Sequence, residues 1–111
     1  MEARLQSSIL VNALQRRAES DGGFAAVLAK GDPTSGAVMV ILAERGRKVR
    51  VLERLLEGGE RYIWRDVGQE ALANEAELEK FLGKRRLYDP DIWLIELDVA
   101  SAERFAAEMN P

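Results

Sequence analysis

Two aspartates on either side of a proline are the residues whose types and spacing could do chemistry in this chain. Asp89, Pro90 and Asp91 stand at the entrance to a run of apolar residues that we expect to form a buried strand. A pair of carboxylates in such a place can serve acid–base catalysis or bind a hard cation through oxygen. Aspartates are also common in turns for local reasons, with Asp89 bonding within the turn and Asp91 pairing with an arginine or meeting solvent. The local role is favoured, because the spacing fixes no third acid to complete a metal site.

Arg16 and Arg17 are candidates for binding an anion. A guanidinium group recognises phosphate or carboxylate through two parallel hydrogen bonds. Consecutive helix residues point about 100° apart, so the two arginines cannot easily form one clamp. The favoured interpretation is that one of them pairs with Asp89, Asp91 or Glu96 and locks the first helix to the last strand. The alternative is a small-ligand site or a histidine-free enzyme in which one arginine works with Asp89 and Asp91.

Two clusters of basic residues raise the possibility of nucleic-acid binding, since lysine and arginine contact phosphates. The first lies on a predicted hairpin tip and the second near the end of a predicted helix: Arg45, Arg47, Lys48 and Arg50, then Lys84, Arg85 and Arg86. Charges on a hairpin also protect it against edge-to-edge aggregation. The net charge of −3 and the lack of aromatic residues beside the first cluster favour this second role.

The large aromatic residues divide between core and surface. Trp93 is expected to pack in the core, whereas Tyr62 and Trp64 share one face of a predicted strand whose other face carries Ile63 and Val67. Apolar area on both faces of a hairpin strand needs a partner wherever no helix covers it. Tyr62 and Trp64 are therefore the predicted interface residues of a homodimer.

Several chemistries are excluded because the chain has no histidine and no cysteine. Ser–His and Cys–His nucleophiles, imidazole or thiolate metal sites and disulfides all need these residues. No phosphate-binding loop, dinucleotide fingerprint or calcium-loop spacing is present either. These absences argue against an enzyme, and we expect no catalytic residue, metal or cofactor.

Length and composition indicate one globular domain over residues 1–111. The 47% hydrophobic and 32% charged content is typical of a folded protein rather than a disordered one. No apolar run approaches the roughly 18–20 residues of a membrane span. The first residues, Met1 to Leu5, do not resemble an export signal, so we expect no membrane association and a cytoplasmic location.

The elements that must position these residues follow from periodicity and turn signals. Helices are predicted at 5–20, 74–88 and 102–108, and strands at 24–29, 37–43, 49–56, 61–67 and 92–98. Asn74 and Ser101 are expected to cap the second and third helices. The nearly continuous apolar runs at 24–29 and 37–43 predict interior strands, and the third strand is expected to bulge or fray near Glu53.

The predicted order is thus α-β-β-β-β-α-β-α. Hairpin connections should make the first four strands antiparallel neighbours. We expect an α+β, two-layer domain: an antiparallel sheet of about five strands with helices packed mainly on one face.

Three blocks of sequence carry a resemblance to a known family. They are Leu5–Ile9 leading to Arg16–Ala18, then Ala25–Asp32 with Gly36–Val38, and finally Tyr88–Asp98. Together they resemble a small bacterial family catalogued as domain of unknown function 1491, whose hallmark is an Asp-Pro-Asp-(Leu/Ile)-Trp strand. The resemblance implies a stand-alone bacterial domain, and it carries no reaction, ligand or partner.

The function favoured by the sequence is a non-catalytic binding or assembly module that forms a homodimer. A ligand-binding or catalytic role for Arg16 or Arg17 with Asp89 and Asp91 is the alternative. Nucleic-acid binding by the basic hairpin tip comes third.

Overall fold

The computed structural model describes residues 5–110, and its element order is the predicted one. Helix α1 spans Ser7–Ser20, α2 Glu75–Tyr88 and α3 Ala102–Met109, with a short 3₁₀ helix, η1, at Gln69–Ala73. The strands are β1 Phe24–Ala29, β2 Val38–Glu44, β3 Arg47–Glu57, β4 Arg61–Asp66 and β5 Trp93–Asp98. The α+β class and the five-stranded sheet are confirmed.

The sheet order is β1-β5-β2-β3-β4, so the last strand lies between the first two. β5 is parallel to β2 and antiparallel to β1, which makes the sheet mixed rather than wholly antiparallel. The expectation that β1 and β2 pair as a hairpin is therefore wrong. The physical reason is burial: Trp93, Leu94 and Ile95 are buried, and the middle of the sheet is the place where helices cover both faces of a strand.

β1 is consequently an edge strand, and the prediction of an interior strand at residues 24–29 is wrong. Phe24, Val27 and Leu28 remain 75%, 42% and 48% exposed. The same prediction for the second strand is correct, since every residue from Val38 to Ala43 is buried. An apolar run alone did not distinguish the two cases.

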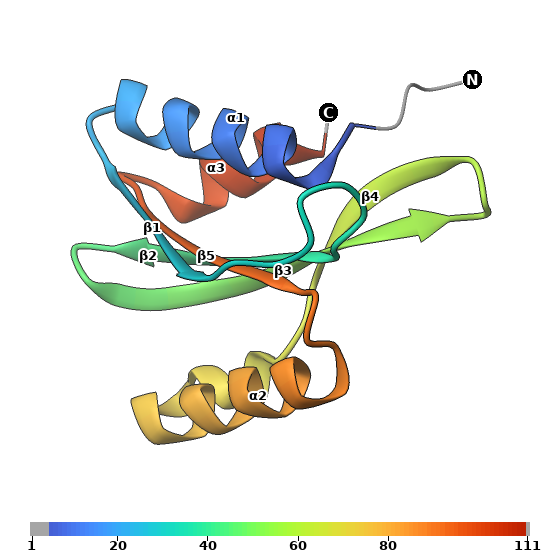
Figure 1. Cartoon of the computed structure of the whole chain (residues 1–111). Coiled ribbons are helices and arrows are strands. Elements are labelled where there is room, and N and C mark those ends of the chain that lie inside the picture. Colours follow the sequence, from blue (N-terminus) through green and yellow to red (C-terminus); the bar gives the residue numbers. More distant parts are fainter. Residues whose placement is uncertain (1–4, 111) are drawn as a thin grey trace.

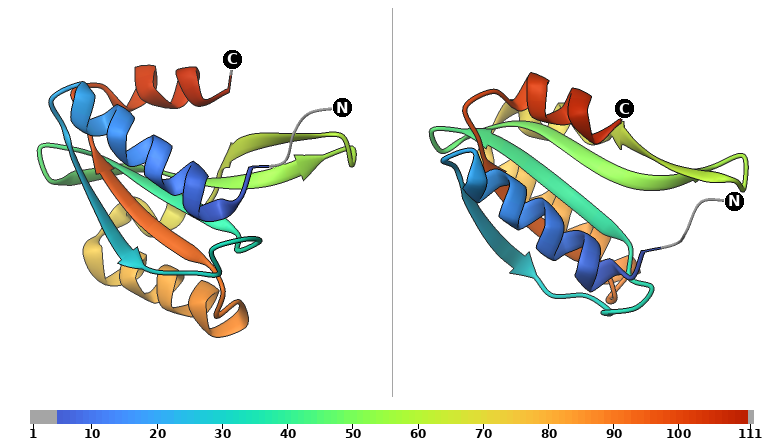
Figure 2. Two further views of the ribbon diagram at one scale, coloured as in Figure 1. Left: turned by 45° about the horizontal axis from the view of Figure 1, so that its top comes forward. Right: turned by 90° about the horizontal axis from the view of Figure 1, so that it is seen from above.

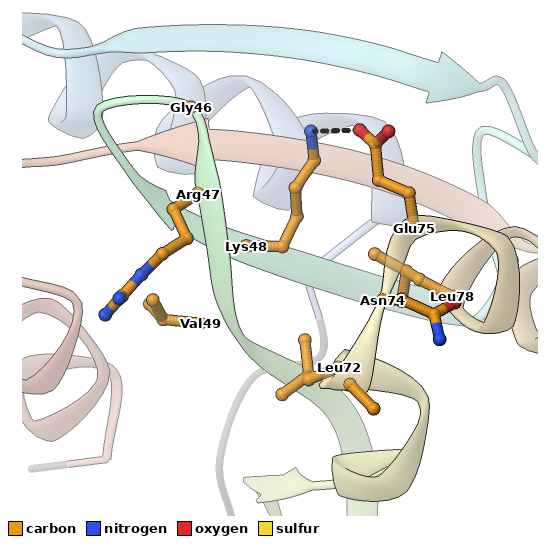
Figure 3. A pocket seen from close by; sticks show the side chains of 9 residues that line it. Gly46, Arg47, Lys48, Val49, Leu72, Asn74, Glu75 and Leu78 are labelled. Atoms are coloured by element: carbon orange, nitrogen blue, oxygen red, sulfur yellow. Dashed lines mark ion pairs between the residues drawn. The ribbon is translucent and has the colours of Figure 1, made fainter.

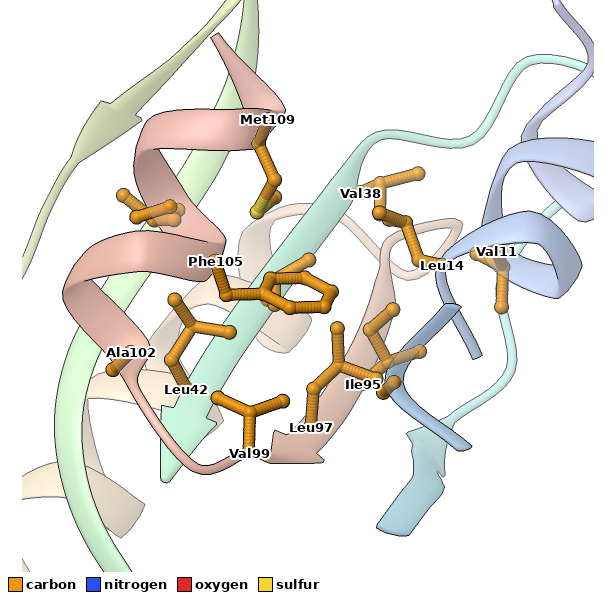
Figure 4. Packing of buried hydrophobic residues seen from close by; sticks show 14 of the residues in the cluster. Val11, Leu14, Val38, Leu42, Ile95, Leu97, Val99, Ala102, Phe105 and Met109 are labelled. Carbon is orange, nitrogen blue, oxygen red and sulfur yellow. The ribbon is translucent and has the colours of Figure 1, made fainter. Parts of the chain in front are cut away.

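Helices cover both faces of the sheet, as Figure 1 shows. α1 and α3 lie on one face, and α2 with η1 lies on the other, which adds a third layer to the expected two. Alternate residues of β2 supply the two cores: Val38, Val40 and Leu42 face α1 and α3, whereas Met39 and Ile41 face α2. Figure 4 shows the larger core, in which Phe105 of α3 packs among side chains of the sheet.

The predicted helix caps are confirmed. Asn74 Oδ1 accepts a hydrogen bond from the backbone N–H of Glu77 at 2.8 Å, and Ser101 Oγ accepts one from Arg104 at 3.2 Å. Each such cap stabilises a helix by about 1 kcal/mol because it satisfies an otherwise unpaired donor.

The hairpin of β3 and β4 extends beyond the body of the molecule, as both views in Figure 2 show. β3 pairs regularly across Glu53, so the expected irregularity there is absent. The register shift in this part of the sheet falls instead where β2 passes from Leu42 to Ala43.

Candidate functional site

The three blocks of the resemblance meet at one corner of the molecule. The backbone N–H of Asp32 donates to the carbonyl of Asp91 at 3.0 Å, and Trp93 Nε1 donates to the carbonyl of Asp32 at 2.7 Å. Ser7 Oγ at the start of α1 donates to the carbonyl of Gly36 at 2.5 Å. Residues far apart in sequence thus fix α1, the β1–β2 loop and the start of β5 to one another.

Two glycines allow this close approach. A Cβ atom on Gly31 or Gly36 would overlap the carbonyl oxygen of Asp91, so neither position has room for a side chain. Asp32 shapes the same loop: its carboxylate accepts hydrogen bonds from the backbone N–H groups of Thr34 at 3.1 Å and Ser35 at 2.8 Å. The bond from the Ser35 N–H is the main reason why the pKa of Asp32 lies below its ordinary value. Asp32 is therefore a turn former.

A cleft of about 310 Å³ opens at this corner, and we call it the corner cleft. Its walls come from α1, the β1–β2 loop, the β3–β4 hairpin and the turn before β5: Leu5, Ser7, Thr34–Val38, Arg54, Tyr62, Asp89 and Asp91. Asp89 Oδ1 accepts the backbone N–H of Asp91 at 3.2 Å, which is the expected local turn bond. The Asp91 carboxylate is exposed and has no hydrogen bond or ion pair within residues 5–110.

Among the described residues that line the corner cleft, the cation is Arg54, which the sequence analysis did not single out. Its guanidinium carbon lies 3.9 Å from the ring centroid of Tyr62. Arg54 stands opposite Trp64 in the β3–β4 ladder, two pairs away from the pair that contains Tyr62, so both side chains lie on the same face. The alternation of side chains along β3 could have predicted that Arg54 lies on the same face as Tyr62. That this face lies beside Asp89 and Asp91 depends on the order of the strands in the sheet.

Arg16 and Arg17 lie away from the corner cleft. They stand about nine residues beyond Ser7, which separates them from the corner by roughly 14 Å along the helix. Arg17 forms an ion pair with Glu108 of α3 and lies 4.7 Å over the ring of Phe105. The predicted pairing with the last strand is wrong, because α1 lies beside α3. Arg16 is exposed and forms no ion pair with any described residue.

The aromatic residues behave differently from one another. Trp93 is buried in the larger core, as predicted. Trp64 is half-buried and packs partly against that core, and its backbone groups bond to Asn110. Tyr62 is half-buried beneath Arg54. The predicted interface residues are thus partly covered by the chain itself.

Within the part of the chain that the structure describes, acidic residues pair with three of the seven residues in the basic clusters. Lys48 Nζ lies 3.8 Å from Glu96 and 3.9 Å from Glu75, at the cavity of about 640 Å³ drawn in Figure 3. Arg50 Nε donates to Asp66 at 2.9 Å, and Arg85 donates to Glu53. Within residues 5–110, no group of three or more acidic residues is placed to hold a metal ion.

The two edges of the sheet differ in protection. At β4, the Trp64 N–H donates to Asn110 Oδ1 at 2.8 Å, and Asn110 Nδ2 donates to the Trp64 carbonyl at 2.6 Å. A side-chain amide therefore occupies the place of a neighbouring strand, and β4 also carries Arg61, Arg65 and Asp66. β1 has the sequence FAAVLA with no charge, and in the described part of the chain it pairs only with β5.

The chain resembles solved structures over almost its whole length. A crystal structure of a DUF1491 family protein from Caulobacter crescentus CB15 is 33% identical, with a TM-score of 0.75 and 91% of each chain covered. An NMR structure of a DUF1491 family protein from the same organism is 31% identical, with a TM-score of 0.78 and 94% of each chain covered. A solution structure from A. tumefaciens is 28% identical, with a TM-score of 0.72 and coverage of 93% and 92%.

A comparison with curated proteins finds no match. The family model described as a protein of unknown function, DUF1491, matches residues 5–107. The match includes the corner where the three sequence blocks meet, and the fold agrees with that of the solved relatives. The chain belongs to the DUF1491 family.

Proposed function

We propose that the protein is a non-catalytic assembly module that forms a homodimer through β1. The observation that carries the proposal is the contrast between the two edges of the sheet. An open edge presents unpaired N–H and C=O groups and readily accepts another strand. Asn110 and three charged residues protect β4, whereas β1 is uncharged and exposes Phe24, Val27 and Leu28.

This proposal moves the predicted interface from Tyr62 and Trp64 to β1. Trp64 already packs against the core, and Tyr62 already contacts Arg54, so less of their apolar area is available to a partner. β1 leaves large apolar side chains and a free edge on the same strand. Adding a strand at this edge would be favourable for two reasons: the backbone N–H and C=O groups of β1 would form hydrogen bonds, and its apolar side chains would be removed from water.

Light scattering coupled to size exclusion tests the proposal. The wild-type protein should elute as a dimer, and Val27→Glu should be a folded monomer because it places a charge on the contact. Leu87→Glu is the matched control: Leu87 is 77% exposed on α2, an element that takes no part in the proposed strand pairing, and its variant should stay dimeric. A wild-type monomer at high concentration would overturn the proposal. So would a dimer lost in Tyr62→Glu but kept in Val27→Glu.

The proposed location of this module is a bacterial cytoplasm. The solved relatives come from bacteria, and a chain without cysteine has none of the disulfides on which many small secreted domains depend. No helix among residues 5–110 has the length and apolar character needed to cross a bilayer. Fractionation of the native host checks the location, with a periplasmic or membrane-bound pool as the contrary result.

A second candidate function is small-ligand binding at the corner cleft. It is supported by the exposed Asp91 carboxylate, which shares the cleft with Asp89 and Arg54. Arg16 and Arg17 do not contribute to this version of the site. Titrating the ¹⁵N-labelled protein with magnesium and with free arginine tests it: saturable shifts around Asp91 that vanish in Asp91→Asn would support it, and unchanged spectra would not.

Nucleic-acid binding has less support. Lys48, Arg50 and Arg85 already pair with acidic residues, which leaves fewer cations for phosphates. We expect mixed DNA and RNA probes to run unshifted at 50 mM salt, and a salt-sensitive shift would contradict this expectation.

A further inference from the structure

We propose that two copies pair β1 antiparallel about a two-fold axis through Ala25, which joins their sheets into one continuous sheet of ten strands. This inference rests on the proposed self-association through β1. It names the partner surface and its register.

Symmetry restricts the register first. A two-fold axis perpendicular to a sheet must pass through a pair of identical residues, because opposed residues of antiparallel strands lie on the same face. The axis therefore passes through one residue of β1 and its copy. The regular part of β1 then selects Ala25: pairing with β5 is continuous from Phe24 to Val27, and the register shifts between Val27 and Ala29. With the axis at Ala25, residues 23–27 of one copy run antiparallel to residues 23–27 of the other. The register shift between Val27 and Ala29 then lies outside the new ladder.

Side-chain sizes agree with this register. Phe24 lies opposite Ala26 of the second copy on the α2 face, and Val27 lies opposite Gly23 on the α1 face. Bulky side chains thus oppose small ones, which lets the exposed apolar area of Phe24 and Val27 pack without a clash. α1 lies over β1, so the same axis brings the two α1 helices side by side on one face of the joined sheet.

Charges at the ends of β1 are complementary under the same operation. Asp21 precedes the strand at the end of α1, and Lys30 follows it; both are exposed, and neither forms an ion pair with a described residue. Beyond Val27 the strand contains one extra residue relative to β5. In an antiparallel pair the end of one strand lies beside the start of the other, so Lys30 is brought to the same end of the contact as Asp21 of the second copy, and the two-fold axis makes the pair twice.

Cysteine scanning tests the register cleanly, because the chain has no cysteine of its own. Opposed residues of an antiparallel pair have Cβ atoms about 5 Å apart, close enough for a disulfide, whereas diagonal residues are about 7–8 Å apart. Ala25→Cys should form a covalent dimer under mild oxidation, and Ala26→Cys should form little. Crosslinking of Ala26→Cys in preference to Ala25→Cys would overturn the register.

A charge swap tests the end contacts. Lys30→Glu and Asp21→Lys should each raise the dimer dissociation constant by roughly three- to thirtyfold at low salt, and the double variant should return to near the wild-type value. Independent effects of the two changes would overturn the proposed pairing. A dimer that Val27→Glu disrupts but that shows neither the crosslink nor the rescue would leave the proposed function standing without this register. A wild-type monomer would defeat both.

Discussion

At the scale of single residues, Glu53 is the most constrained charge in the described chain. It is 9% exposed, and both of its oxygens accept hydrogen bonds from Arg85 of α2. The pKa of Arg85 is raised, chiefly because its side chain donates to Glu53. The sequence suggested no more than an irregular strand at Glu53 and a surface cluster around Arg85. The ion pair instead ties α2 to the sheet.

Replacing Glu53 by glutamine should lower the free energy of unfolding by about 1–3 kcal/mol, because it leaves Arg85 partly buried without its charged partner. Urea denaturation measures this loss. Glu57→Gln is the control: its bridges to Arg61 and Arg65 are long, at 3.7 and 3.8 Å, and exposed, so its effect should stay below about 0.5 kcal/mol. Equal losses in the two variants would contradict the assignment.

Asp32 should make stability depend on pH. Its pKa is lowered in the folded protein, so its stabilising effect is complete above the ordinary value of 3.8 and is lost as pH falls through the folded value. Asp32→Asn should therefore melt below wild type at pH 7, and the gap should narrow as the solution is acidified below about pH 4. Melting curves at pH 7 and pH 3 check this. Glu79→Gln, an exposed change on α2, should give no such gap, and a gap for Asp32→Asn that is unchanged at pH 3 would contradict the role.

At the scale of elements, glycines show where backbones must touch. Gly36 has no room for a Cβ because the Asp91 carbonyl occupies the space, whereas Gly83 lies in α2 with nothing within 4 Å of such an atom. The sequence places Gly36 in a loop between two predicted strands and Gly83 inside a predicted helix, but it does not show what either glycine contacts. Their environments are opposite: Gly36 lies where the β1–β2 loop contacts the turn before β5, whereas Gly83 faces solvent.

Gly36→Ala should therefore destabilise the protein by more than about 2 kcal/mol, since the start of β5 must shift to make room. Gly83→Ala should stabilise it by about 0.5–1 kcal/mol through helix propensity. Thermal or urea unfolding of both variants gives the comparison. A neutral Gly36→Ala would mean that the corner tolerates movement, and a destabilising Gly83→Ala would mean that α2 has a covered face there.

At the scale of the whole molecule, the sheet has one guarded edge and one open edge. Under the proposed pairing, a contact between two β1 strands would close on itself, and the protected β4 edge would prevent further addition. Asn110 follows α3, and α3 is joined to α1 by the ion pair between Glu108 and Arg17. The protection of β4 by Asn110 therefore depends on the packing of α3. The pKa of Glu108 is lowered mainly by the hydrogen bond from Arg17, in keeping with this junction.

Removing the Asn110 side chain from the β4 edge should change the oligomeric state. Asn110→Ala should cost about 1 kcal/mol and expose the backbone groups of Trp64, so that dimers add further copies through β4. Light scattering should show larger species that grow with concentration. Glu79→Ala, an exposed change on α2, is the control and should leave the dimer unchanged. An Asn110→Ala protein with wild-type mass would contradict the guarding role.

How far the sequence predicted this molecule varied with the range of the interaction. The caps at Asn74 and Ser101 were predictable because a cap joins residues three apart. The local turn bond of Asp89 followed in the same way. The partner of Arg17 was not predictable, because it depends on α3 lying beside α1, and β1 was misplaced because an apolar run reads alike at an edge and in the interior.

The sequence by itself determined the elements and their order, the burial of β2 and β5, and the exclusion of histidine and cysteine chemistry. Those properties depend on residue types and on spacings within one segment. Only the tertiary structure decided that β5 lies between β1 and β2, that Arg54 shares a cleft with Asp89 and Asp91, and that β1 forms an open edge. These depend on how several segments together bury apolar area and satisfy backbone groups, a balance that no single segment encodes.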